Sequence, residues 1–253
     1  IMPERILDVL PTIYLRHLLA TRQISQLSPR DIIHVLLLCS LRDDPLMCGI
    51  CGVIELQHSG RVDPALIRGM TARIAHRGPD GDGFYTSPDG LAHFGMRRLS
   101  IIDVAGSDQP LYNEDRSIAL VFNGEIYNYR ELRADLAARG HKLHTEGDGE
   151  TLAYLYEGAG VPGMFVGLRG MYAFALHDAG RKRSVLAVDH IGMKPLYLWE
   201  HDGLLSFASE VKCFLANPQF QARLNLETLD AYLSFGFMIG EATLFEGVRR
   251  IMP

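Results

Sequence analysis

From Met47 onward, short apolar stretches alternate with Gly-rich turns, and a few amphipathic helical patterns lie between them. The apolar stretches have the length of buried strands. This pattern predicts helices that pack on β-sheets, and it favours the α+β class. We expect strands at 52–56, 118–122, 171–177, 184–188, 196–200 and 204–208, with the last two forming a hairpin around His201-Asp202-Gly203.

Three helices are predicted within the same part of the chain. Pro64 after Asp63 is typical of a helix start, and the apolar residues that follow recur at helical spacing until Gly78-Pro79. Two further helices are expected over 129–139, which ends at Gly140, and over 226–237. No internal repeat and no low-complexity tract interrupts this order.

Composition narrows the class of protein. The 253 residues are 47% hydrophobic, which is enough apolar material for one sizeable core. The net charge of -5 is spread in mixed signs, so we expect neither a nucleic acid nor a membrane as partner. Four cysteines are too few for a disulfide framework in a chain of this length, which indicates a reducing compartment and a cytoplasmic location.

Residues 1–46 differ from the rest because they are rich in Leu and Arg and contain no Gly. The chain opens on Ile1, and Met47 stands directly before the first recognisable motif. The apolar run 32–39 is about half of the roughly 20 residues that a membrane-spanning helix needs. We expect 1–46 to be an upstream extension that is not native or is removed.

Cys48 and Cys51 form a Cys-x-x-Cys pair, which allows several interpretations. A structural zinc site needs four ligands, and no second pair completes one, so no metal site is expected. A thioredoxin-like redox site precedes a helix, whereas a strand is expected here. An ordinary buried-cysteine role stays open.

Met-Cys-Gly at 47–49 also has the form of an N-terminal nucleophile before its methionine is removed. Removal of Met47 would free the α-amine of Cys48, which could serve as general base for its own thiol. One residue would then supply both the nucleophile and the base.

Five motifs carry a more specific signal: Met-Cys-Gly-Ile at 47–50, His-Arg-Gly-Pro-Asp at 76–80, Arg-Leu-Ser-Ile-Ile-Asp at 98–103, Asn-Gly-Glu-Ile-Tyr-Asn at 123–128 and Asp-His-Ile-Gly-Met-Lys-Pro-Leu-Tyr at 189–197. In type and order they resemble the class II glutamine amidotransferase half of the asparagine synthetases, over about 47–212. The resemblance implies an N-terminal-nucleophile hydrolase fold, an αββα sandwich of two antiparallel sheets between helical layers.

Catalytic roles are expected for Cys48, Asn123 and Gly124. The Asn side-chain amide and the Gly backbone N–H are two neutral donors of the kind that stabilise an oxyanion. An Asn-Gly hairpin turn is the alternative for the dipeptide alone. The preceding apolar stretch places both residues at the end of a strand.

Substrate-binding roles are expected for five residues. Arg98 offers a planar fork for a carboxylate, and the resemblance places the glutamine-binding Arg here; a solvated surface charge is the alternative for it and its neighbour Arg97. The backbone from Leu99 to Ile102 would line the same pocket. The resemblance implies that Asp148, assisted by Glu125, pairs with the substrate ammonium, although a helix N-cap is its alternative. Gly147 departs from the Ser that the family usually has.

The resemblance implies a division into an extension at 1–46, a glutaminase domain at 47–215, and a connector with the start of an ATP-dependent synthetase domain at 216–253. Such a domain releases ammonia from glutamine for amidation of aspartate to asparagine. It needs no cofactor itself, whereas ATP and Mg²⁺ belong to the synthetase half, whose Ser-Gly-Gly loop does not occur before Pro253.

The expected partners are therefore glutamine, the synthetase domain and aspartate, and a homodimer is left open. Two alternatives also stay open. The acceptor could be a sugar or a cell-envelope precursor, because the glutaminase half does not define it. The domain would be inactive if residues 1–47 are not removed, because the amine of Cys48 would then be an amide.

Overall fold

The computed structural model describes residues 47–57, 62–103 and 106–253. The expectation for residues 1–46 lies outside the described residues. Within them, ten strands form two sheets in which every pair of neighbours is antiparallel.

The larger sheet has the strand order β10-β8-β9-β1-β3-β2. Its strands are β1 (Gly49–Glu55), β2 (Gly81–Thr86), β3 (Ala92–Arg98), β8 (Tyr197–His201), β9 (Leu204–Ala208) and β10 (Val248–Arg250). The smaller sheet has the order β4-β5-β6-β7. Its strands are β4 (Leu111–Tyr112), β5 (Ile118–Ile126), β6 (Gly170–Asp178) and β7 (Arg183–Val188).

Strand β1 shows why the two sheets stack. Its side chains alternate between two faces, as strand geometry requires. Cys51 and Val53 belong to the core under helix α3 (Pro64–Ala72), whereas Ile50 and Ile54 belong to the core shared with β5 and β6. Because both faces are covered, all seven residues of β1 are buried.

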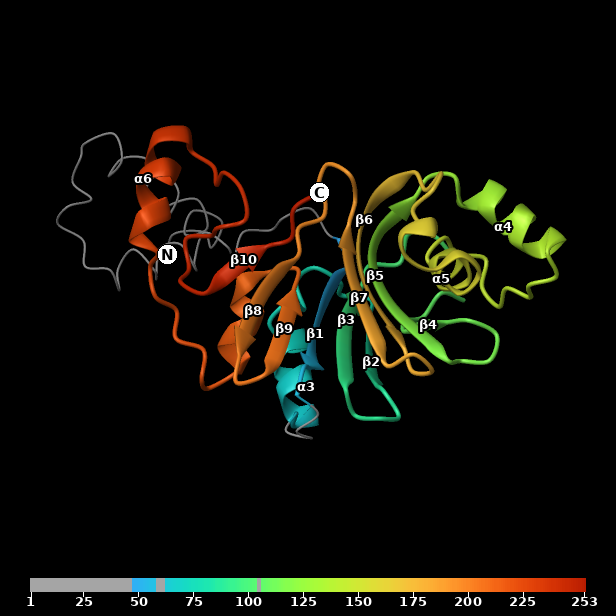
Figure 1. Cartoon of the computed structure of the whole chain (residues 1–253), viewed down its shortest axis with the longest axis horizontal. Helices are drawn as coiled ribbons and strands as arrows, with labels where there is room; N and C mark the ends of the chain where they lie inside the picture. The colour runs from blue at the N-terminus through green and yellow to red at the C-terminus, as the bar shows by residue number, and fades with distance from the viewer. Residues whose placement is uncertain (1–46, 58–61, 104–105) are drawn as a thin grey trace, which may run out of the picture.

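Helices cover the outer faces of both sheets (Figure 1). Helix α3 and the short 3-10 helix η3 (Val211–Ala216) pack on the larger sheet. Helix α5 (Glu150–Gly163) packs on the smaller sheet, and α4 (Tyr129–Ala138) packs against α5. The result is two antiparallel sheets between helical layers, which is the architecture predicted from the sequence.

All six predicted strands are present, with ends shifted by up to four residues. The hairpin between β8 and β9 turns at Asp202 and Gly203, which both have positive φ. Strands β2 and β3 were not predicted, because Gly, Asp and His interrupt their apolar pattern. Helix α3 ends at Ala72, six residues before the predicted stop at Gly78.

The prediction that Asn123-Gly124 lies at a strand end is wrong, and so is the hairpin alternative. Strand β5 continues through both residues to Ile126, because β6 pairs with it as far as Gly170. A side chain at position 124 would collide with the carbonyl oxygen of Met171 on β6. Glycine therefore lets β5 and β6 stay paired beside this position.

The segment 216–253 adds one edge strand to the larger sheet. Strand β10 pairs with β8, and Phe245 and Val248 pack in the same core as α3. Helix α6 (Leu226–Phe235) ends where Gly236 adopts a left-handed conformation, and none of its residues is buried. The domain boundary at 215/216 stays a prediction.

Two glycines of the larger sheet allow a direct test of this packing. A methyl group at Gly52 would lie 2.5 Å from both the His93 carbonyl oxygen and the Phe207 ring, whereas one at Gly81 would meet nothing within 4 Å. We expect Gly52→Ala to lower the free energy of unfolding by about 1–3 kcal/mol, and Gly81→Ala to change it by less than about 1 kcal/mol. Urea unfolding of both variants measures the difference; equal effects would contradict the packing described.

Candidate functional site

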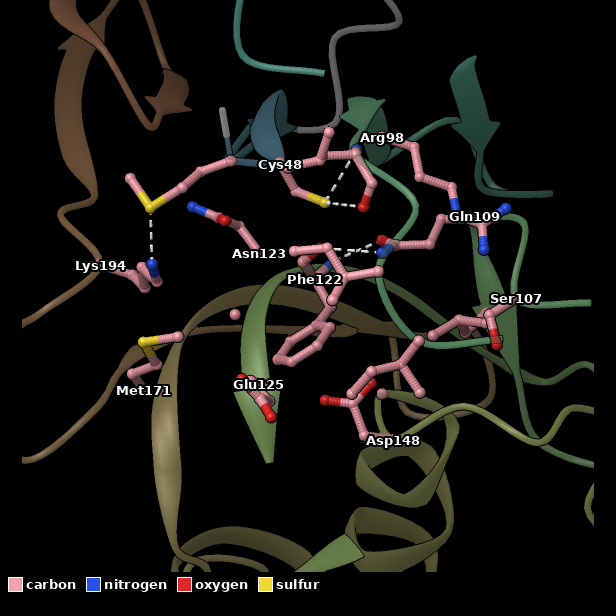
Figure 2. Close-up of a pocket in the computed structure, with 17 residues that line it drawn as sticks. Cys48, Arg98, Ser107, Gln109, Phe122, Asn123, Glu125, Asp148, Met171 and Lys194 are labelled. Carbon is pink, nitrogen blue, oxygen red and sulfur yellow. Dashed lines mark hydrogen bonds between the residues drawn. The ribbon is translucent and has the colours of Figure 1, made fainter. Parts of the chain in front are cut away.

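A cavity of about 190 Å³ opens where the ends of β1 and β3 meet strand β5 and the start of α5. Figure 2 shows side chains from both sheets around it. All eight residues predicted for the site line this cavity: Cys48, Arg98, Leu99, Ile102, Asn123, Gly124, Glu125 and Asp148. The fold thus brings together residues that are up to 100 positions apart in the sequence, while their individual roles stay predictions.

Cys48 lies directly before β1, and its thiol is held by the backbone of Leu99. The Leu99 N–H donates to Sγ at 3.3 Å, and Sγ lies 3.5 Å from the Leu99 carbonyl oxygen. Burial raises the pKa of the Cys48 thiol, and the Leu99 N–H and the Arg98 charge offset this only in part. The thiol is therefore neutral near pH 7 and needs a base before it can attack.

The main chain at Cys48 is fixed by Arg77. Its Nε donates to the Cys48 carbonyl oxygen at 3.0 Å, and its own carbonyl oxygen accepts from the Met47 N–H at 3.0 Å. With Met47 attached, the nitrogen of Cys48 is a peptide nitrogen and has no basicity. The Met47 side chain itself lines the cavity.

Arg98, at the end of β3, is buried and lines the cavity with its guanidinium engaged in two hydrogen bonds of 2.7 Å. One goes to the carboxylate of Asp108 and the other to the carbonyl oxygen of Asp103. Asp108 is highly exposed, so an incoming carboxylate could exchange with it. Arg97 points elsewhere, to the Gly78 carbonyl oxygen and the Asp82 carboxylate.

Asp148 is a buried carboxylate on the cavity wall opposite Arg98 in the view of Figure 2. It accepts the backbone N–H of Ile126 at 2.8 Å and does not cap α5, so the N-cap alternative is wrong. Burial raises its pKa, and nearby Glu125 raises it further. None of the ion pairs among the described residues involves Asp148, so a bound cation would be favoured here.

Asn123 presents a hydrogen-bond donor that no described residue satisfies. Its Nδ2 is buried and has no partner among the described residues, although the side chain lines the cavity. Native structures leave few buried donors unpaired, and those that remain call for an explanation. A ligand oxygen in the cavity would supply the missing acceptor.

Several residues of the cavity were not predicted from the sequence: Met47, Ser107, Gln109, Met171 and Lys194. The side-chain amide of Gln109 clamps the backbone of Phe122, beside Asn123, at 2.6 and 2.9 Å. Lys194 is buried, and its ammonium contacts the Met47 sulfur at 2.7 Å. Lys194 lies in the motif at 189–197, and this motif is the sequence feature that could have indicated a place for it in the cavity.

The two cysteines of the Cys-x-x-Cys pair lie in different surroundings: Cys48 lines the cavity, whereas Cys51 has the buried role that the sequence left open. Cys51 faces the opposite side of β1 and contacts Thr71 Oγ1 at 3.4 Å, so it is a buried core cysteine. Within 47–57, 62–103 and 106–253, no group of three or more His, Cys, Asp or Glu side chains could hold a metal ion. In the same described part of the chain, no helix is long and apolar enough to cross a bilayer.

Solved structures with a similar arrangement include the glutamine phosphoribosylpyrophosphate amidotransferase of B. subtilis in complex with ADP and GMP. It aligns with a TM-score of 0.54 at 19% identity over 70% of this chain and 45% of that chain. An allosteric regulatory enzyme of purine biosynthesis aligns with a TM-score of 0.56 at 22% identity over 67% of this chain and 43% of that chain. The predicted N-terminal-nucleophile hydrolase fold is confirmed.

Relatives found by sequence share a higher identity with this chain than these solved structures do. The chain is 38% identical to asparagine synthetase [glutamine-hydrolyzing] 1 of Bacillus subtilis over 82% of this chain and 32% of that protein. It is 43% identical to asparagine synthetase [glutamine-hydrolyzing] 2 of rice over 66% of this chain and 27% of that protein. The chain spans about a third or less of the length of these relatives. The glutamine amidotransferase domain model matches residues 47–253, so the chain belongs to this family of amidotransferase domains.

Proposed function

We propose that this chain hydrolyses glutamine with Cys48 as nucleophile and the α-amine of the same residue as base. The observation that carries the proposal is the buried Nδ2 of Asn123, which has no hydrogen-bond partner among the described residues and lies in the cavity that holds the Cys48 thiol. A developing oxyanion on the substrate amide carbon would accept from it, and the Gly124 backbone N–H is the second proposed donor.

The free amino-acid end of glutamine accounts for the charged groups of the cavity. Its carboxylate would bind the fork of Arg98, and its ammonium would bind Asp148 with help from Glu125. Arg98 and Asp148 line the same cavity as Cys48, so a single glutamine molecule could contact all three. Binding at both ends would hold the side-chain amide next to the sulfur.

The reaction then proceeds in two steps. The α-amine of Cys48 takes the thiol proton, the sulfur bonds to the amide carbon, and the C–N bond breaks as the ammonium returns its proton to the leaving ammonia. Water next attacks the thioester carbon with the amine again as base, and glutamate leaves as the thiol is restored. Both steps need the bond between Met47 and Cys48 to have been cleaved.

The fate of the ammonia is proposed from the relatives. In a full-length protein like the asparagine synthetases, a following domain would use ATP and Mg²⁺ to activate aspartate for amidation, and a cytoplasmic location fits this role. A sugar or cell-envelope acceptor is the second candidate, because the described cavity binds glutamine and does not select the acceptor. Assaying the full-length protein with aspartate and ATP would separate the two.

Replacing the nucleophile tests the reaction itself. We expect Cys48→Ala, in a protein that otherwise begins at position 48, to reduce glutamate release by a factor of about 10⁴ or more, because no group remains to form the thioester. The melting temperature should stay close to that of the parent protein. A coupled glutamate assay measures the rate.

Cys51→Ala is the matched control for this change, because Cys51 is buried on the other face of β1. It should keep most of the activity at some cost in stability. An equal loss in both variants would favour a paired-cysteine role over the proposed nucleophile.

The substrate carboxylate contact can be tested with two neighbouring arginines. Arg98→Lys keeps the charge but loses the planar fork, and we expect the KM for glutamine to rise about 10-fold to 100-fold while kcat changes little. Arg97→Lys should leave KM nearly unchanged, since Arg97 binds Gly78 and Asp82 outside the cavity. Steady-state kinetics on both variants decide; an unchanged KM in Arg98→Lys would remove Arg98 from substrate binding.

A further inference from the structure

Four ionisable side chains form a cluster beside the main chain of Cys48: His76, Arg77, Glu210 and Lys212. The Glu210 carboxylate joins them, with Oε1 2.9 Å from Arg77 Nη1 and 3.0 Å from His76 Nε2, and Oε2 2.7 Å from Lys212 Nζ. Arg77 and Lys212 are buried. None of the four lines the cavity that contains Cys48, so they cannot touch a substrate bound there.

The cluster reaches Cys48 through Arg77. The guanidinium Nε donates to the Cys48 carbonyl oxygen at 3.0 Å, while Nη1 is held by Glu210. The remaining nitrogen, Nη2, is buried without a hydrogen-bond partner among the described residues. The orientation of this guanidinium among the described side chains therefore depends on Glu210.

The same segment also fixes the strand that follows Cys48. Ser209, next to Glu210, exchanges two hydrogen bonds with Ile50: its Oγ accepts from the Ile50 N–H at 3.0 Å, and its N–H donates to the Ile50 carbonyl oxygen at 2.8 Å. The Arg77 side chain packs on Gly49, where an added methyl group would lie 3.0 Å from Cδ. Arg77 and Ser209, which are bound to Glu210 and next to it in the chain, respectively, thus hold the main chain from Cys48 to Ile50.

Glu210 remains ionised in this setting. Burial alone would raise its pKa, but the ion pair with Lys212 and the hydrogen bond from Arg77 lower it below its ordinary value. A neutral amide at position 210 would be a weaker acceptor for the two neighbouring cations, Arg77 and Lys212. Arg77 would then be held less firmly at Nη1, while its hydrogen bond to the Cys48 carbonyl oxygen would remain.

We propose that Glu210 is a positioning residue for Cys48: it fixes the Arg77 guanidinium, which in turn sets the Cys48 main chain and hence the place of its sulfur and α-amine. The proposal rests on the glutaminase function proposed above. A positioning residue can have a large effect on rate, because a displacement of about 1 Å at a reacting group can lower the rate about 100-fold.

The test is Glu210→Gln in the protein that begins at Cys48. We expect kcat for glutamate release to fall about 10-fold to 100-fold with the KM for glutamine within about twofold of the parent value, because substrate contacts are untouched. The rate at which iodoacetamide alkylates Cys48 should also change, and mass spectrometry of the modified peptide measures it. This second readout does not need glutaminase activity.

Asp178→Asn is the matched control. Asp178 is a buried carboxylate at the end of β6 that accepts hydrogen bonds from Tyr156 and Arg181, so this change also removes the charge of a buried carboxylate. It should lower the melting temperature and leave both kcat and the alkylation rate of Cys48 unchanged. If Glu210→Gln does not fold, Glu210→Asp replaces it, because it keeps the charge but withdraws the carboxylate from Arg77.

Wild-type kcat and alkylation rate in a folded Glu210 variant would overturn the positioning role, as would losses equal to those of the Asp178 variant. If the parent protein releases no glutamate, the proposed function fails, while the alkylation rates still decide whether Glu210 positions Cys48.

Discussion

The register between β1 and β3 is the constraint on which the site depends. It sets Gly49 opposite Arg97, so Cys48 falls opposite Arg98 at the end of the larger sheet. The Leu99 N–H can then reach the Cys48 sulfur, and the Arg98 guanidinium lies in the same cavity. A shift of β1 by one residue would turn the Cys48 side chain to the face of the sheet away from Arg98. Burial of β1 on both faces fixes the register firmly.

Burial also determines the electrostatics of the cavity. It raises the pKa of the Cys48 thiol and of the Asp148 carboxyl, so the charged form of each group needs a neighbour that stabilises it. The thiol requires a base to become a thiolate, and the carboxylate is stabilised by a bound cation. A free α-amine on Cys48 and the ammonium of glutamine would meet these two requirements. Asn123 adds a buried donor, and no acceptor for it is present in the described part of the chain.

Much of the fold and of the cavity could be predicted, because the residues that indicate them lie in short motifs that are local in the sequence. Apolar strands such as 118–122 and the turn at Asp202-Gly203 follow from pattern and turn chemistry. Other features depend on contacts distant in sequence. Strand β5 continues through Asn123-Gly124 because β6 pairs beside it, and Glu210 approaches Cys48 because η3 packs on α3. Lys194 reaches the cavity through a loop that Asp189 holds with three backbone hydrogen bonds, which spacing alone does not reveal.

The central claim is that a free amino group on Cys48 performs the base chemistry. Its most direct test compares glutamate release by two forms of the same protein, one beginning at Cys48 and one retaining Met47, each verified by intact mass. The account predicts activity in the first form alone, decreasing as the pH falls below the amine's ordinary pKa of about 7.7–8.0. Equal activity in the form that retains Met47 would contradict it.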